Sequence, residues 1–164
     1  MSSRIPTLAP LIPREHLRDW AEEQRRRGRS IVFTNGCFDL LHEGHLKSFM
    51  EARRHGDLLL VAVNDDLSVR QLKGEGRPIL PESSRVLMLR SLRAVDAVTI
   101  FADLSSLPTI EVVQPHVLAK GSQYGEEEIV GHAEVRKWGG RVVRLPMIEG
   151  LSTTQLLRRV RGDR

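Results

Sequence analysis

The run DLLLVAVN at residues 57–64 constrains the fold most, because an unbroken stretch of apolar residues fills its centre. A strand with one face in water alternates apolar and polar side chains. A strand covered on both faces does not, and such strands are typical of parallel sheets with helices on each side. The run therefore predicts a central strand of a parallel sheet. It is far shorter than the ~20 apolar residues that a membrane-spanning helix needs.

Similar runs alternate with helical segments along the rest of the chain. Strands are expected at 30–35, 57–64, 96–101, 116–121 and 141–146, and helices at 13–27, 45–56, 82–95, 104–114, 126–140 and 152–162. This order predicts an α/β, Rossmann-like open parallel sheet of about five strands with helices on both faces. We expect a single domain over residues 1–164, with a loose or surface-packed arm at 1–12 and a Gly/Pro-rich polar loop at 69–81.

The charge of the chain points to an acidic ligand. A net charge of +4 and a pI near 9.8 suit a nucleotide or a sugar phosphate, and they also suit nucleic acid. The basic clusters at 25–29 and 158–164 close two expected helices, where cations complement the helix dipole. One Tyr and four Phe leave little for base stacking. We therefore expect no nucleic-acid partner.

The location expected from the sequence is the cytoplasm, without a membrane partner. The single cysteine, Cys37, excludes an internal disulfide and suits a reducing compartment. The stretch 1–16 lacks the apolar centre of a signal peptide.

The end of the first expected strand resembles an anion site. Thr34, Asn35 and Gly36 end that strand, and His42 and His45 flank Gly44 at the entry to the next helix. Free N–H groups and the positive dipole end of a helix meet there, at the edge where open parallel sheets bind ligands. The stretch has neither the G-x-G-x-x-G pattern nor a P-loop, so other groups must hold a phosphate.

Three interpretations of the two histidines compete. As structural residues they would cap or pack. As zinc ligands they would need further Cys or His ligands, and no pair elsewhere obviously completes a site. As phosphate ligands both imidazoles would donate to phosphate oxygens, with Gly44 allowing a close approach. The pairing around a Gly at a strand end favours the third interpretation.

Two stretches then resemble a known family. TNGCFDLLHEGHL at 34–46 resembles the G-x-F-D-x-x-H-x-G-H signature of the H-x-G-H, cytidylyltransferase-like nucleotidyltransferases. EGLSTTQLLRRV at 149–160 resembles their second signature. The segments 72–98 and 117–143 are most similar to the free-standing adenylyltransferase domain of bacterial ADP-heptose synthases. The resemblance implies transfer of AMP from ATP to a heptose 1-phosphate, with Mg²⁺ as cofactor, bound through the phosphates and not by the protein directly.

The resemblance also implies roles for individual residues. His42, His45 and Lys73 would be catalytic, with Lys73 on a loop that closes over the phosphates. Asp39 and Asp66 would meet the acceptor. The nucleotide would contact Thr34, Asn35, Gly36, Phe38, His42, His45, Arg85, Lys120, Gly121, Ser152, Thr153 and Thr154. A homodimer or higher homo-oligomer is compatible with small sheets of this kind. Arg85 has a second interpretation, in which it braces the loop.

Other functions remain open at the level of sequence. Within the family, the alternatives are a glycerol-3-phosphate cytidylyltransferase or an FMN adenylyltransferase. Outside it, the alternative is a nucleotide- or nucleic-acid-binding module without turnover. One departure concerns the acceptor: Gln123 stands where the heptose enzymes usually carry Asp.

A second departure predicts the choice of nucleotide. Glycerol-phosphate cytidylyltransferases carry an Arg just ahead of their second signature, where this chain has Met147 and Ile148. Without that Arg the site lacks a hydrogen-bond donor for CTP. The ratio of kcat/KM values should therefore favour ATP over CTP by at least about tenfold. Pyrophosphate release with one acceptor and either nucleotide measures the ratio. A ratio in favour of CTP would place the chain with the cytidylyltransferases.

Overall fold

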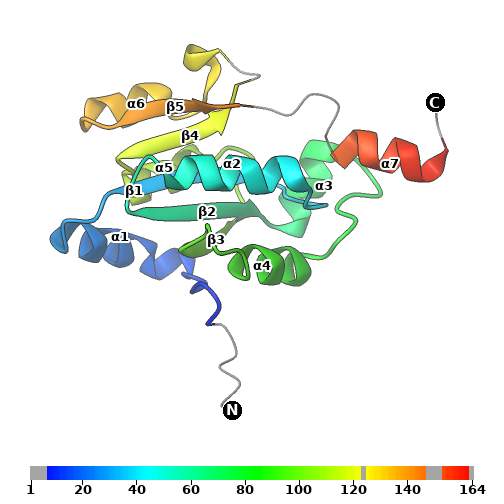
Figure 1. Cartoon of the computed structure of the whole chain (residues 1–164), viewed down its shortest axis with the longest axis horizontal. Helices are drawn as coiled ribbons and strands as arrows, with labels where there is room; N and C mark the ends of the chain where they lie inside the picture. The colour runs from blue at the N-terminus through cyan, green and yellow to red at the C-terminus, as the bar shows by residue number, and fades with distance from the viewer. Residues whose placement is uncertain (1–6, 123–124, 147–152, 163–164) are drawn as a thin grey trace.

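The computed structural model describes residues 7–122, 125–146 and 153–162. Five parallel strands form one open sheet in the order β3-β2-β1-β4-β5 (Figure 1). The strands are β1 (Ile31–Gly36), β2 (Leu58–Asn64), β3 (Ala97–Phe101), β4 (Val117–Gly121) and β5 (Arg141–Leu145). The Rossmann-like parallel sheet expected from the sequence is confirmed.

Helices cover both faces of the sheet (Figure 1). The helical segments are η1 (Arg14–His16), α1 (Leu17–Arg26), α2 (Glu43–Arg53), α3 (Asp66–Lys73), α4 (Glu82–Arg90), α5 (Leu107–Val113), η2 (Glu126–Glu128), α6 (His132–Lys137) and α7 (Thr153–Arg161). Buried residues of α1, α5 and α6 form one apolar cluster with the sheet. Buried residues of α2 and α4 form a second cluster on the opposite face. None of the helices in the described ranges could cross a bilayer, since each is too short or too polar.

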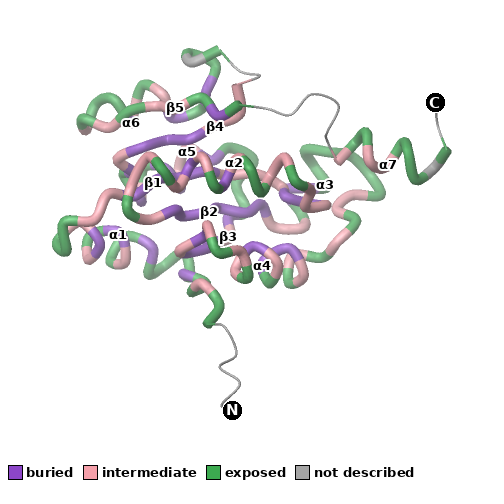
Figure 2. The backbone as a smooth tube through the Cα atoms, in the orientation of Figure 1, coloured by how far each residue is buried: buried purple, intermediate pink, exposed green. Residues whose placement is uncertain are grey.

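The central strands are buried on both sides, as the apolar run at 57–64 predicts. Residues 59–64 of β2 are all buried, and β1 pairs with β2 along its whole length, from Ile31 opposite Leu58 to Gly36 opposite Val63. Figure 2 shows this burial as a continuous band through the middle of the sheet. A rigid, fully paired β1–β2 core therefore fixes where each strand ends.

The strand order reverses direction between β1 and β4. The helices that follow these two strands leave to opposite faces, and a crevice opens beyond the strand ends at such a switch point. Gly36, Asn64 and Gly121 close their strands at this edge. The sequence segments that carry the expected site follow these three positions.

Of the two forms expected for the arm at 1–12, loose or surface-packed, residues 9–12 adopt the packed one. Ile12 donates its N–H to Val98 O, Val98 donates to Pro10 O, and Ala9 donates to Arg90 O. Leu11 forms a parallel bridge with Val98, and Ile12 belongs to the core. Residues 9–12 therefore extend the edge of the sheet, because β3 would otherwise expose unpaired backbone groups. Residues 1–6 lie outside the described residues.

Two expected boundaries differ from the structure. The helix expected at 126–140 is divided into η2 and α6 by Gly131, whose φ is +88°. A Cβ there would lie 2.7 Å from Ile110 Cδ1, so the backbone conformation and the close packing both call for glycine. The loop expected at 69–81 is also wrong in its first half, because α3 extends to Lys73.

The helix α3 forms because Asp65 caps it. The Asp65 side chain accepts the N–H of Ser68 at 2.7 Å, and the Ser68 hydroxyl donates back to Asp65 O at 3.2 Å. Val69, a residue of this helix, is fully buried. This cap starts α3 immediately after β2 and places Lys73 at its last turn.

Removing the cap should loosen this helix. Asp65→Ala should lower the free energy of unfolding by about 0.5–2 kcal/mol, because one N–H at the start of α3 loses its acceptor. Asp65→Ser is the matched control, since a serine hydroxyl can still accept that N–H. Urea unfolding of the three proteins tests this. Equal stability of the alanine variant and the wild type would show that α3 does not depend on the cap.

Candidate active site

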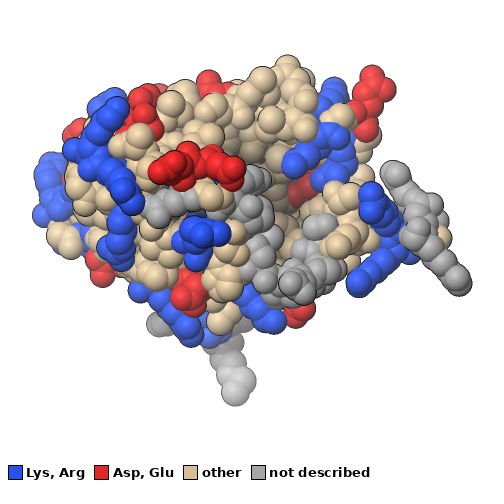
Figure 3. Space-filling model, turned by 90° about the horizontal axis from the view of Figure 1, so that it is seen from above, with Lys and Arg blue, Asp and Glu red and all other residues tan. Residues whose placement is uncertain are grey.

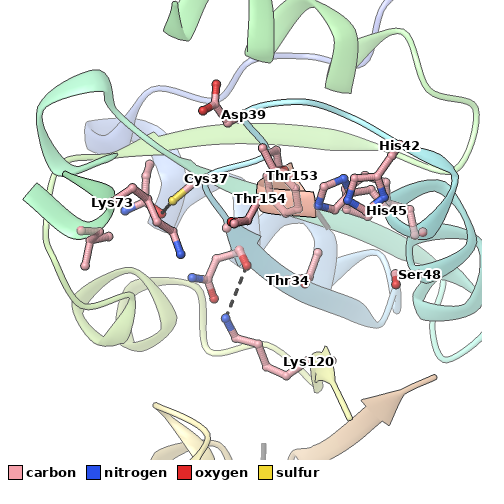
Figure 4. A pocket seen from close by; sticks show the side chains of 18 of the residues that line it. Thr34, Cys37, Asp39, His42, His45, Ser48, Lys73, Lys120, Thr153 and Thr154 are labelled. Carbon is pink, nitrogen blue, oxygen red and sulfur yellow. Dashed lines mark hydrogen bonds between the residues drawn. The ribbon is translucent and has the colours of Figure 1, made fainter. Parts of the chain in front are cut away.

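A cavity of about 490 Å³ opens at the carboxyl ends of β1, β2 and β4. The starts of α2 and α7 and the last turn of α3 complete its wall. Most of the residues predicted from the sequence line it: Thr34, Asn35, Gly36, Phe38, Asp39, His42, His45, Lys73, Lys120, Gly121, Thr153 and Thr154 (Figure 4). Segments more than a hundred residues apart in the sequence thus meet in one concave surface.

The two histidines form a stacked pair at the start of α2. Their ring centroids lie 3.8 Å apart, and the ring planes are inclined by 27°. His42 precedes the first residue of the helix, and its side chain makes no capping bond. The first N–H groups of α2 therefore have no capping side chain, and they lie beside both imidazoles at the positive end of the helix dipole.

Burial keeps both imidazoles neutral in the unliganded protein. Burial, together with the neighbouring His42, lowers the pKa of His45 to about 4. Burial also lowers the pKa of His42. The Nδ1 atoms of both rings are buried without a hydrogen-bond partner in the described part of the chain. The single proton of a neutral ring can then reside on Nε2, where it can be donated to a ligand oxygen.

Phe38 fixes the position of the histidine pair. Its ring packs edge-on against His45, with centroids 5.5 Å apart, and against Phe49 at 5.2 Å. Phe38 adopts a φ of +47°, and a Cβ on Gly36 would lie 3.1 Å from its ring. Gly36 is therefore needed so that the chain can turn Phe38 beneath His45. This packing makes Phe38 a support for the imidazoles.

Two lysines approach the cavity from different sides. Lys73, at the end of α3, is exposed at the rim and lies opposite the histidines in Figure 4. Lys120, at the end of β4, is partly buried, and its Nζ donates to Asn35 O at 3.4 Å. Burial lowers the pKa of Lys120 to about 8. An anion entering the cavity would meet both ammonium groups.

Arg85 does not line the cavity, which corrects its prediction as a nucleotide ligand. Its side chain has 0% exposure and donates to Cys37 O at 2.7 Å, Asn64 O at 2.8 Å and Leu80 O at 3.1 Å. It also forms an ion pair with Asp66 at 2.8 Å. Because its donors are engaged, Arg85 braces the site, which was its second interpretation. Asp66 lies outside the cavity lining, and its Oδ1 is bound to Arg85. Its role as an acceptor ligand stays a prediction.

Asp39 also holds the loop in place. Its carboxylate accepts from Arg77 Nε, from Ile79 N at 2.7 Å and from Leu80 N at 3.0 Å. The side chain is fully enclosed. Asp39 therefore secures residues 77–80 against β1, and both of its oxygens are occupied. Asp39 also lines the cavity, and its role as a residue that meets the acceptor stays a prediction.

The first turn of α7 reaches the same cavity. The Thr153 hydroxyl donates to Leu40 O at 3.4 Å, which ties α7 to the loop after β1. Ser152 lies outside the described residues, as do Gln123, Met147 and Ile148.

Sequence reasoning missed several wall residues. These are Ser48, Phe49, Asn64, Leu72, Arg77 and Leu145. Asn64 could have been predicted as a wall residue, because it is a polar residue at the end of an apolar strand.

The Cys37 thiol is not poised as a nucleophile for covalent catalysis. Cys37 Sγ lies 3.8 Å from Asn64 Oδ1, and burial raises the pKa of its thiol. It therefore stays protonated near neutral pH. The same ranges hold no group of three or more His, Cys, Asp or Glu side chains that could bind a metal ion. The chemistry that this arrangement supports is the binding and orientation of a polyphosphate.

Comparisons with known proteins identify a matching family, similar proteins and a similar solved structure. The cytidylyltransferase-like family matches residues 33–159. The chain is 46% identical over 147 residues to "Bifunctional protein HldE" of Syntrophotalea carbinolica, covering 90% of this chain and 30% of that protein. It is 47% identical over 149 residues to the protein of the same name from Koribacter versatilis, covering 91% of this chain and 31% of that protein. The chain thus spans about a third of the length of these relatives.

One solved structure supports the fold. The "lipopolysaccharide core biosynthesis protein" of Thermoplasma volcanium superposes with a TM-score of 0.64 at 28% identity. The match covers 74% of this chain and all of the other.

The neutral state of His45 predicts that acid destabilises the protein. The pKa of His45 in the fold, about 4, lies below its ordinary value of 6.5. Between these values the unfolded chain binds a proton that the folded chain does not. Stability is therefore fully present above pH 6.5 and is lost as the pH falls toward 4. The loss should be on the order of 2 kcal/mol, after allowance for partial exposure.

Urea unfolding between pH 7 and pH 4 measures this slope. His45→Asn should flatten it, while His16→Asn, which removes an exposed histidine outside the site, should not. An unchanged slope in His45→Asn would show that His45 is not the group responsible.

Proposed function

We propose, because the chain belongs to the cytidylyltransferase-like family of nucleotidyltransferases, that it transfers AMP from ATP to a sugar 1-phosphate of the heptose class. The products are an ADP-sugar and pyrophosphate. One observation carries the proposal: a stacked pair of neutral histidines at a helix N-terminus faces a cavity that two lysines also reach. Such a site is suited to a polyphosphate, and the Cys37 thiol in its wall stays protonated near neutral pH.

The reaction needs little acid–base chemistry. A phosphate oxygen of the acceptor is already ionised near neutral pH, so it can attack the α-phosphorus of ATP without a general base. The new bond joins that oxygen to the α-phosphorus. The bond from the α-phosphorus to the bridging oxygen breaks, and pyrophosphate leaves with the electron pair. Catalysis then consists of positioning and charge stabilisation.

The histidines are placed to stabilise the charge that moves to the leaving group. His42 and His45 would donate from Nε2 to oxygens of the α- and β-phosphates, beside the first N–H groups of α2. Lys73 would neutralise the phosphates from the rim. Thr153 and Thr154 would contribute from the start of α7, where the helix dipole again favours an anion. These interactions strengthen as the bridging bond breaks.

Mg²⁺ fits this site as a partner of the substrate. Because the described residues contain no group of carboxylates or imidazoles that could hold the ion, its ligands would be phosphate oxygens and water. When bound it would neutralise phosphate charge. The role of the protein is to hold the phosphates that carry it.

The face shown in Figure 3 does not favour the nucleic-acid alternative. On the face shown in Figure 3, Lys and Arg side chains lie in separate groups with acidic side chains between them. A protein that tracks a nucleic-acid backbone needs a continuous basic groove. The substrate proposal rests on the cavity, which is the size of a small-molecule site.

Pyrophosphate release with a panel of substrates tests the proposal. Four nucleoside triphosphates are each paired with D-glycero-β-D-manno-heptose 1-phosphate, glycerol 3-phosphate and FMN. The proposal expects the highest kcat/KM for ATP with the heptose 1-phosphate. Turnover confined to CTP with glycerol 3-phosphate, or to ATP with FMN, would replace it with one of the other family reactions.

Variants of the cavity test the roles of the histidines. His42→Ala and His45→Ala should each lower kcat by about 10²–10³-fold and change the KM for ATP far less, because their bonds strengthen in the transition state. Lys73→Ala should also lower kcat. His55→Ala, just beyond the far end of α2, is the matched control and should keep full activity. Near-normal turnover of either cavity histidine variant would exclude the phosphate-binding role.

A further inference from the structure

A second cavity of about 300 Å³ lies beyond the carboxyl ends of the same strands. The residues that line only this cavity come from the end of β3 and from two segments that precede helices. These segments are residues 104–106 before α5 and 128–130 before α6. These helices pack on the face of the sheet opposite α2. The two cavities share Asn35, Asn64, Leu72 and Lys120.

We propose that this second cavity binds the sugar ring of the acceptor, while the larger cavity binds ATP. The inference rests on the proposed function. It assigns a substrate to a cavity that the histidine pair does not reach, and it makes Glu128 and Ser106 residues that select the acceptor.

The direction of the reaction places the acceptor on this side. In phosphoryl transfer the attacking and leaving oxygens lie roughly in line with the phosphorus between them. The histidines and the start of α2 hold the leaving side. The attacking oxygen must approach from the opposite side, past the shared wall. Asn35 and Lys120 form that wall, and the bond from Lys120 Nζ to Asn35 O is drawn in Figure 4. Lys120 then lies between the two cavities, where it can contact the phosphates of ATP and the phosphate of the acceptor.

The lining of the second cavity suits a polyhydroxylated ring. Asn35 Oδ1 is buried and has no hydrogen-bond partner in the described ranges. A buried unpaired oxygen calls for a donor. A sugar hydroxyl can donate to it, whereas an ionised phosphate oxygen cannot. Ser105, Ser106 and Glu128 add further polar groups, and Ile129 and Phe101 add an apolar surface.

Glu128 and Ser106 each keep hydrogen-bonding capacity at this wall, Glu128 as an exposed residue and Ser106 as a buried one. Glu128 Oε2 accepts the N–H of Gly125 at 2.8 Å, which orients the carboxylate and leaves Oε1 to accept a hydroxyl. Ser106 is 95% buried (5% exposed) yet gives α5 no side-chain capping bond. The neighbouring Ser105 hydroxyl accepts the N–H of Leu107 instead, at 3.2 Å. The hydroxyl of Ser106 is therefore not used to start the helix.

The size of the cavity favours a single sugar ring. At about 300 Å³ it lies at the lower end of the usual range for small-ligand sites, about 300–1,000 Å³. A tricyclic flavin would also need broad aromatic or apolar walls, and among the described residues Phe101 is the one aromatic side chain in this lining. The cavity therefore fits a monosaccharide phosphate better than FMN.

Binding of the acceptor tests the inference separately from turnover. The probe is D-glycero-β-D-manno-heptose 1-phosphate, titrated by calorimetry into protein saturated with a non-hydrolysable ATP analogue. Glu128→Ala should weaken its binding by about tenfold and Ser106→Ala by about threefold, with affinity for the ATP analogue unchanged. Glu127→Ala is the matched control, because this exposed neighbour does not line the cavity.

Each outcome decides between the two proposals. If the wild type turns over the heptose 1-phosphate but neither variant weakens its binding, the inference is wrong and the proposed function stands. If the variants weaken binding but the wild type releases no pyrophosphate, the cavity assignment stands and the proposed function falls. If the wild type does not bind the heptose 1-phosphate at all, both are wrong.

Discussion

The site depends on the hydrogen bonds and the ion pair that one buried group makes, the guanidinium of Arg85. From α4 it bonds the backbone after β1 at Cys37, the end of β2 at Asn64 and the loop at Leu80, and it pairs with Asp66 in α3. A buried charge is tolerated only when its donors are satisfied, and these four acceptors satisfy it. One side chain thereby joins four segments that the cavity requires at fixed positions. Asp39 extends the same network to residues 77–80.

The sheet and much of the site follow from local patterns. The apolar run at 57–64 and the alternation around it are sufficient to predict parallel strands, because burial on both faces leaves no polar position. The positions of Thr34, His42, His45 and Lys120 in the cavity follow once the strand ends are known, since parallel strands bring their carboxyl ends to one edge.

Arg85, Asp39 and α3 could not be assigned in the same way. An arginine that braces the backbone and one that binds phosphate have the same sequence signature, and only burial distinguishes them. The helix α3 was not predicted because Gly74, Gly76 and Pro78 follow it within a few residues. They make the whole stretch resemble a loop. Its start depends on one side-chain cap, Asp65 to Ser68. The pairing of residues 9–12 with β3 is likewise a long-range contact without a local signal.

The electrostatics of the cavity complement its shape. Burial weakens the charged forms of His42, His45 and Lys120, as the lowered pKa of each indicates. A protein that held three full positive charges together here would bear their mutual repulsion whenever it was empty. A polyphosphate reverses that balance, because its negative charge favours protonation of every group it touches. Lys120, whose pKa of about 8 leaves it largely protonated near neutral pH, supplies positive charge before the anion arrives, and the neutral histidines supply N–H donors. In the proposed reaction the histidines would lie on the leaving side of the α-phosphorus, and Lys120 would lie at the wall shared with the second cavity, where the acceptor approaches.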